Sequence, residues 1–324
     1  MNKQIDVSVI VVTYNSEWSK IQATLTSVLK QKDVALEIII ADDGSKNNNQ
    51  DQIEGFFKLN NFFDYYINPS AYNRGTVINI SDALKFVHGK YTKTIAPGDL
   101  LFYERTLRDW IDYMEHQKLC VSFGDAVFYS IDSGKIVFHK TKGCPCNKKI
   151  YLKDNPKKVF IDYLLVNDTI LGASLLMKTN TITQYIQLIR GRIIYAEDYI
   201  IRIMIFNQIK VGFFPYEVIW YEYGTGISTS NNTRWKSILH RDYEMSDEII
   251  RQEGNNRSLQ GKKYMLYLKI NNSLFRKIVK VLLFPQFLPM RYKMKFINLS
   301  SIEKYDNKYI ERCFLGDIKV NASH

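Results

Sequence analysis

Residues 36–45, Leu-Glu-Ile-Ile-Ile-Ala-Asp-Asp-Gly-Ser, decide the fold that we expect of this chain. Their largely apolar first half, rich in β-branched residues, ends in the acidic turn Asp42-Asp43-Gly44-Ser45. A second run, Val7 to Val12, leads into Thr13-Tyr14-Asn15. Such nearly continuous apolar strands are typical of a parallel sheet covered on both faces. Because open α/β sheets bind ligands beyond the carboxyl ends of their strands, the polar residues after both runs predict a nucleotide site.

The segment between the two strands predicts a helix. Apolar residues recur there at helical spacing from Trp18 to Leu29, after Asn15 or Ser16 as the expected cap. The chain therefore opens as strand, helix, strand. No Gly-x-Gly-x-x-Gly motif follows the first strand, which argues against a dinucleotide site of the NAD type.

In their order and spacing, residues 9–15 and 37–45 resemble the start of a family 2 glycosyltransferase. The resemblance covers roughly the first 230 residues. It implies an α/β protein of the GT-A fold, with a mostly parallel central sheet flanked by helices, that transfers sugars with inversion. The residues that it implies for the base and ribose of the donor are Thr13, Tyr14, Asn15, Asp42 and Asp43.

Two further segments extend the resemblance towards the donor. Asn73-Arg74-Gly75 and Asn79 are similar to family positions beside the nucleotide, although Ile78 stands where an Arg is common. The strand expected over residues 89–95 ends at Ala96-Pro97-Gly98-Asp99, where the family usually carries an Asp-x-Asp-Asp cluster. Only Asp99 remains of that cluster.

Asp99 is the expected metal contact. Mg²⁺ and Mn²⁺ favour oxygen ligands and can take the others from phosphate and water. A single carboxylate makes a weaker site than two, so metal dependence stays open. The alternative is that Pro97-Gly98-Asp99 is simply a turn.

Glu197-Asp198 precedes a second helical run. Acidic residues at a helix start can act as dipole partners alone, contributing about 0.3–1 kcal/mol. In register with the family, however, the pair resembles the motif whose Asp is the general base. The resemblance implies that Asp198 deprotonates the acceptor hydroxyl and that Glu197 positions it.

The stretch Phe213 to Ser228 resembles the strand and Gly-x-Ser loop that close the catalytic domain. Gly224 and Gly226 would let this loop fold over a bound diphosphate. Arg234, further on, is a candidate phosphate contact, and a solvated surface Arg is the alternative. Segment 166–178 is expected to form one wall of the acceptor site, with Asn167 and Asp168 as exposed polar candidates. The alternative, a helix or strand boundary at these two residues, is favoured.

The 324 residues divide into a catalytic domain, 1–230, and a basic, largely helical extension, 231–324. The net charge of +11 concentrates after about residue 260, where cations border aromatic and aliphatic residues. That pattern suits an anionic membrane surface, a helix packed on the domain with its basic face in water, or a homodimer contact. No apolar stretch approaches the roughly 18 residues that a span requires. Nothing matches a nucleic-acid-binding motif, so we exclude that partner.

We expect transfer from a nucleotide-sugar donor, a UDP-sugar above others, to a hydroxyl of a growing, lipid-linked glycan, as in bacterial capsule, O-antigen or exopolysaccharide synthesis. The expected cofactor is Mn²⁺ or Mg²⁺. Without a signal peptide in the first residues, the expected location is the cytoplasm, at the inner face of the membrane. Two alternatives stay open: a non-catalytic, nucleotide- or glycan-binding subunit of a polysaccharide complex, and transfer to a polyprenyl phosphate, which needs no base.

Overall fold

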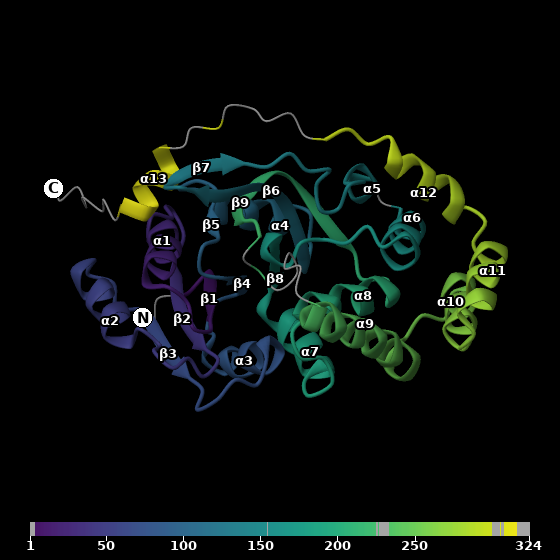
Figure 1. Cartoon of the computed structure of the whole chain (residues 1–324), viewed down its shortest axis with the longest axis horizontal. Coiled ribbons are helices and arrows are strands. Elements are labelled where there is room, and N and C mark those ends of the chain that lie inside the picture. The colour runs from purple at the N-terminus through teal and green to yellow at the C-terminus, as the bar shows by residue number, and fades with distance from the viewer. Residues whose placement is uncertain are drawn as a thin grey trace.

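A single mixed sheet forms the centre of the computed structural model, which describes residues 4–153, 155–224, 226, 233–299, 305 and 308–315 (Figure 1). Its strand order is β3-β2-β1-β4-β8-β6-β9-β5, and β7 pairs with β6. The four strands β3, β2, β1 and β4 are parallel, and β6 is parallel to β9, whereas β8 and β5 run antiparallel to their neighbours. The strands are β1 (Val7–Thr13), β2 (Leu36–Asp42), β3 (Tyr65–Pro69), β4 (Tyr91–Ile95), β5 (Leu100–Leu101), β6 (Val121–Asp132), β7 (Lys135–Phe138), β8 (Leu175–Lys178) and β9 (Val211–Glu222).

Helices cover both faces of this sheet, which confirms the predicted α/β layering. Alternate residues of the first strands point to opposite sides. Ile10 enters the core under α3, α7 and α8, while Val9 enters the core under α1 and α4. The helices are α1 (Trp18–Leu29), α2 (Gln50–Leu59), α3 (Thr76–Ala83), α4 (Thr106–His116), α5 (Lys149–Leu152), α6 (Pro156–Ile161), α7 (Thr179–Ile189), α8 (Ile200–Phe206), α9 (Thr233–Glu253), α10 (Leu259–Leu268), α11 (Ser273–Leu283), α12 (Phe287–Lys295) and α13 (Lys308–Leu315).

The first helix begins differently from the expectation. Its N-cap is Glu17, which makes no capping hydrogen bond with its side chain. Asn15 instead adopts a left-handed conformation, φ 47°, and its side chain accepts the Lys46 N–H at 3.0 Å. The predicted cap is therefore wrong, because the Asn15 side chain binds the turn after β2 instead of the first turn of α1.

The segment after residue 230 packs onto the rest of the protein. Ile249 of α9 and Tyr264 of α10 belong to the same buried core as α7 and α8. Arg202, on α8 and 1% exposed, forms an ion pair with Asp247 of α9 at 2.6 Å. The last described helix, α13, returns to pack on α1, as Figure 1 shows. Within the described ranges, no helix is both long and apolar enough to cross a bilayer.

Candidate functional site

The ends of β1 and β2 are joined by side chains that the sequence analysis placed in the nucleotide site. Thr13 pairs with Asp42 in the parallel ladder, and its hydroxyl donates to the Asp42 carboxylate at 3.0 Å. Asp42 also accepts the Ser45 N–H at 2.9 Å. Thr13 and Asp42 are buried, whereas the side chain of Tyr14, which follows Thr13, is half exposed. Asp42 thus shapes the turn, and Tyr14 is the side chain presented outward.

Asp43 joins this turn to the loop before α3. Its two carboxylate oxygens accept the backbone N–H groups of Arg74 at 2.8 Å and Gly75 at 2.9 Å. Gly75 has φ 91°, and any side chain there would collide with Ile194. Asn79, in α3, donates from its amide to the Ala41 carbonyl at 2.8 Å. These contacts bring residues 41–43 and 73–79 together.

The side chain of Arg74 has a different environment from its backbone. Its guanidinium forms an ion pair with Asp82 of α3 at 2.7 Å and donates to the Ser70 hydroxyl at 3.1 Å. Lys85 and Arg190 also contact Asp82. The structure therefore places the Arg74 charge in a cluster around Asp82.

Tyr195 is the residue around which several predicted donor contacts gather, although the sequence analysis did not single it out. Its hydroxyl donates to the Asn73 side chain at 3.2 Å, and its ring meets Trp235 edge-on, with centroids 5.0 Å apart. Burial raises the pKa of Tyr195, as does the nearby charge of Asp43, while the Arg234 guanidinium lowers it. Arg234, at the start of α9, is thus close enough to Tyr195 for its charge to act on that hydroxyl.

Asp99 lies in a cluster of charges that spans the ends of β4 and β9. Its Oδ1 accepts the Glu222 N–H at 3.0 Å, and burial raises the pKa of Asp99 to about 7. The Glu222 carboxylate is held by Lys20 of α1, with N–O distances of 2.7 and 2.9 Å. Gly98 has φ 97°, and a side chain there would collide with this carboxylate. Glu222 therefore fills the space that an acidic side chain at position 98 would occupy.

This cluster fits a divalent cation only with help from the substrate. Asp99 Oδ2 accepts no hydrogen bond from the described residues, so one hard oxygen donor is available, and the Glu222 carboxylate is the second. In the part of the chain that the structure describes, no three His, Cys, Asp or Glu side chains come together as a metal site. The remaining ligands would have to be diphosphate and water oxygens.

Lys93 is a fully buried cation on β4 that the sequence analysis overlooked. Its ammonium donates to the carbonyls of Thr94 at 2.7 Å and Ala173 at 2.6 Å. Burial lowers the pKa of Lys93 to about 7, and the charges of Asp99 and Glu197 oppose that shift. The sequence offered no clear signal, because residues 91–95 alternate as in an exposed edge strand and lysine is almost never fully buried without partners.

Glu197 and Asp198 form a one-turn helix, Glu197–Tyr199, directly before α8. Both carboxyl groups lie against Gly172, where an added Cβ would be 3.3 Å from Glu197 Oε1 and 3.3 Å from Asp198 Cβ. Burial raises the pKa of both, and the charge of Asp198 raises that of Glu197 further. Since two adjacent, partly buried carboxylates do not both ionise readily, the pair shares one proton and one negative charge over the pH range between their two ionisations.

The loop that leads into this pair is held by a residue of α9. Asp242 is fully buried, and its carboxylate accepts the backbone N–H groups of Ile194 at 3.1 Å, Tyr195 at 2.8 Å and Ala196 at 3.1 Å. These three donors immediately precede Glu197. The position of the acidic pair therefore depends on a side chain 44 or more residues further along the chain.

Within segment 166–178, residues 172–174 lie beside the acidic pair, whereas Asp168 does not offer the exposed carboxylate expected of it. The one-turn helix Gly172–Ser174 contacts Glu197 and Asp198. Asp168, predicted to be exposed, is only 3% exposed, and its carboxylate accepts the N–H groups of Cys146 and Asn147. The candidate role of Asp168 as an exposed group is wrong, because its carboxylate holds the neighbouring loop, whereas the boundary alternative is confirmed at Asn167. Asn167 ends the π-helical turn Asp162–Val166 in a left-handed conformation.

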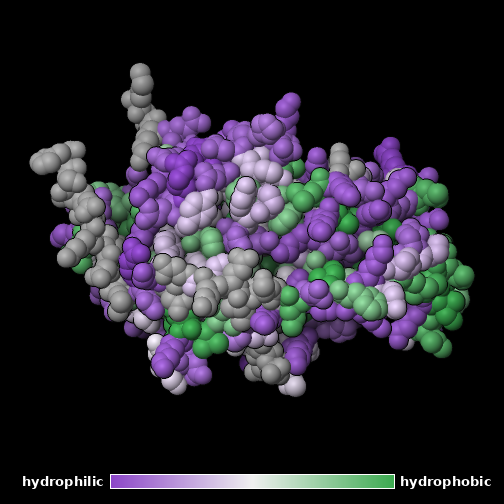
Figure 2. Space-filling model, turned by 90° about the horizontal axis from the view of Figure 1, so that it is seen from above, coloured by the Kyte–Doolittle hydropathy of each residue, from purple (hydrophilic) through white to green (hydrophobic). Residues whose placement is uncertain are grey.

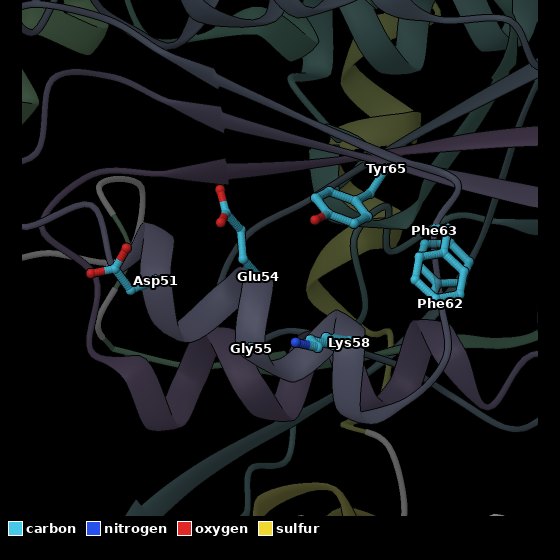
Figure 3. Close-up of a pocket in the computed structure, with 7 residues that line it drawn as sticks. All are labelled: Asp51, Glu54, Gly55, Lys58, Phe62, Phe63 and Tyr65. Carbon is cyan, nitrogen blue, oxygen red and sulfur yellow. The ribbon is translucent and has the colours of Figure 1, made fainter.

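A surface groove lies elsewhere. A cavity of about 430 Å³ opens between α2 and the start of β3, lined by Asp51, Glu54, Gly55, Lys58, Phe62, Phe63 and Tyr65 (Figure 3). It lies at the outer edge of the sheet, whereas the acidic pair lies at the start of α8. Of the predicted closing loop, β9 is confirmed up to Glu222, while residues 225 and 227–232 lie outside the described residues.

Known proteins share the fold of this chain. The sequence pattern of Glycosyl transferase family 2 matches residues 8–179, more than half of the chain. No curated protein sequence matches significantly. The crystal structure of S. aureus TarS 1–349 in complex with UDP-GlcNAc shares 14% identity and a TM-score of 0.53, over 88% of this chain and 81% of that one. Mannosyltransferase PcManGT from Pyrobaculum calidifontis, in complex with GDP-Man and Mn²⁺, shares 12% identity and a TM-score of 0.54, over 90% and 74%. These likenesses show a common fold.

Proposed function

Since the chain belongs to glycosyltransferase family 2 and is a glycosyltransferase, we propose that it transfers a sugar from a nucleotide-diphosphate donor to an acceptor hydroxyl with inversion. The observation that carries this proposal is the partly buried Glu197-Asp198 pair at the start of α8, beside Lys93 and close to Gly172. Such a pair supplies one ionised carboxylate and one neutral partner in the same place.

Asp198 is the proposed general base. As the acceptor hydroxyl attacks the anomeric carbon, its proton passes to the Asp198 carboxylate, and the bond from that carbon to the diphosphate breaks. Burial raises the pKa of Asp198 towards neutral pH, and a base whose pKa lies near the working pH transfers protons more efficiently. Glu197, kept protonated, holds the neighbouring position without adding a second negative charge. Attack opposite the leaving group inverts the anomeric configuration.

The departing diphosphate needs positive charge around it. A divalent cation, when bound, would supply that charge, and Asp99 and Glu222 would hold it. The likeness to PcManGT, whose complex contains GDP-Man and Mn²⁺, supports Mn²⁺ or Mg²⁺ as the cofactor. Arg234, whose charge acts on Tyr195, is the proposed protein cation for the phosphates, and the loop around Gly224 and Gly226 is proposed to cover them.

The donor is proposed to lie over the ends of β1, β2 and β4. Tyr14 is exposed there for the base, and the neighbouring proposed contacts are Thr13, Asn15, Asp42, Asp43, Asn73, Arg74 and Asn79. TarS was solved with UDP-GlcNAc and with UDP, which supports a UDP-sugar as the first donor to test. The proposed acceptor is a growing, lipid-linked surface glycan at the inner face of the membrane, with residues 172–174 at its wall.

The test is Asp198→Asn, with Glu197→Gln as its matched neighbour. We expect Asp198→Asn to bind UDP with unchanged affinity in calorimetry while transfer falls about 10²–10⁴-fold. Glu197→Gln keeps a neutral group at that position and should retain most of the activity. Wild-type turnover by Asp198→Asn would refute the assignment. Selective survival of transfer to a polyprenyl phosphate would favour that acceptor, since its nucleophile is already ionised.

A further inference from the structure

The positive charge of this protein is concentrated in one segment. Residues 254–302 contain ten Lys and Arg and no Asp or Glu, so they account for nearly all of the net charge of +11. Arg276 is paired with Asp247, while Lys263 and Lys280 reach backbone carbonyls. The other seven are exposed, and none forms an ion pair with a described residue: Arg257, Lys262, Lys269, Lys277, Arg291, Lys293 and Lys295.

Helix α11 in this segment packs Val281 and Leu283 on the core but turns a larger apolar face to solvent. Four large apolar side chains point to solvent, with exposed fractions of 68% for Leu274, 55% for Phe275, 51% for Ile278 and 73% for Leu282. At about 100° per residue these four share one face of the helix, within an arc of about 100°. No residue of α11 is fully buried.

The opposite face of α11 carries the cations that contact the protein. Arg276 reaches Asp247 at 3.0 Å, and Lys280 donates to the Leu165 carbonyl. Both lie roughly 180° around the helix from the centre of the apolar face. An amphipathic surface helix normally turns its apolar stripe inward, so this orientation leaves the apolar face for something outside the chain.

A second exposed apolar stripe follows along α12. Leu288, Tyr292 and Phe296 recur every fourth residue, and Arg291, Lys293 and Lys295 lie between them. Figure 2 shows hydrophobic residues gathered at the end of the molecule where Figure 1 places α10 and α11. Exposed apolar patches rimmed by polar residues mark interaction sites.

We propose that the apolar face of α11 enters the interface of a bilayer rich in anionic lipid, with the surrounding Lys and Arg residues on its headgroups. The charge of the segment favours an anionic bilayer as the partner, because a segment with unpaired cations and no acids is complementary to an anionic surface. A second copy of the same segment would bring like charges together. The inference goes beyond the proposed transfer reaction and does not depend on the donor.

The test is cosedimentation of the full chain with vesicles, of phosphatidylcholine alone and with phosphatidylglycerol added. We expect binding only to the anionic vesicles, weakening as salt rises. Lys277→Glu, Lys293→Glu and Lys295→Glu together should lower the partition coefficient at least about a hundredfold. The matched control is Lys58→Glu, Lys118→Glu and Lys135→Glu, which changes net charge equally at exposed sites elsewhere.

The apolar face is tested separately by Phe275→Ser, Ile278→Ser and Leu282→Ser. We expect each to lower vesicle binding about tenfold, while Leu59→Ser and Phe63→Ser, at exposed sites near α2, leave it unchanged. Circular dichroism confirms that each variant is folded. Absence of binding by the wild type, or equal loss in both charge-reversal triples, would overturn the proposal. So would a concentration-dependent dimer, seen by light scattering without vesicles, that the serine variants abolish.

Discussion

Replacing Asp242 by Ala should damage both stability and catalysis, although this side chain lies outside the reacting groups. The carboxylate is fully buried and accepts three backbone N–H groups at 2.8–3.1 Å. Hydrogen bonds to a charged group contribute about 1.5–3 kcal/mol each, and they are not additive. Because water can reach part of the opened loop, we expect a loss of about 3–5 kcal/mol in the free energy of unfolding.

The assay is urea unfolding together with steady-state kinetics. We expect Asp242→Ala to lower kcat about tenfold or more, because residues 194–196 no longer fix the position of Asp198. Asp242→Asn keeps one acceptor oxygen, so its unfolding free energy and its kcat should lie between those of the wild type and of Asp242→Ala. Glu244→Ala, on the exposed face of the same helix, is the control and should change neither quantity. Wild-type stability and kcat in Asp242→Ala would refute the reasoning.

Three further perturbations test the charges of the site. Lys93 loses its proton in the folded protein at about pH 7 but in the unfolded chain near its ordinary pKa of 10.5, so its contribution makes stability rise with pH in that window. Lys93→Met should remove this slope, up to about 1.4 kcal/mol per pH unit; an unchanged slope in urea unfolding at pH 7–10 would contradict it. Asp162 has a raised pKa through burial and its neighbour Asp168, so it destabilises the fold as pH rises above about 4; Asp162→Asn should melt at a higher temperature than wild type at pH 8. Glu222→Gln should reduce the gain in UDP affinity that Mn²⁺ produces in calorimetry, and Glu217→Gln is the control. An undiminished gain would argue against Glu222 as a metal contact.

The fold was predictable where the signal is contiguous. The strands β1 and β2 are short apolar runs with polar ends, and the acidic pair lies directly before a helical run, so each can be recognised within about ten residues. The start of α1 was not predictable in the same way, because Asn15 could cap the helix or reach Lys46 of the next turn. Only the tertiary structure decides between those partners.

The charges around the site escaped prediction for a related reason. Lys20 and Glu222 are 202 positions apart, and nothing local marks either as the partner of the other. Lys93 occurs in a strand that could equally have been an exposed edge. Asp168 was misjudged because its partners, the amides of Cys146 and Asn147, come from a loop of irregular sequence.

The contact between Asp242 and the loop before Glu197 bears on how this chain could be recombined with its relatives. A chimaera with its crossover at residue 230 would take the acidic pair from one parent and the carboxylate that orients it from the other. Arg202 and Asp247 would be separated by the same cut. Exchange of acceptor preference between such enzymes is therefore best attempted with α8 and α9 inherited together, so that the crossover follows Glu253.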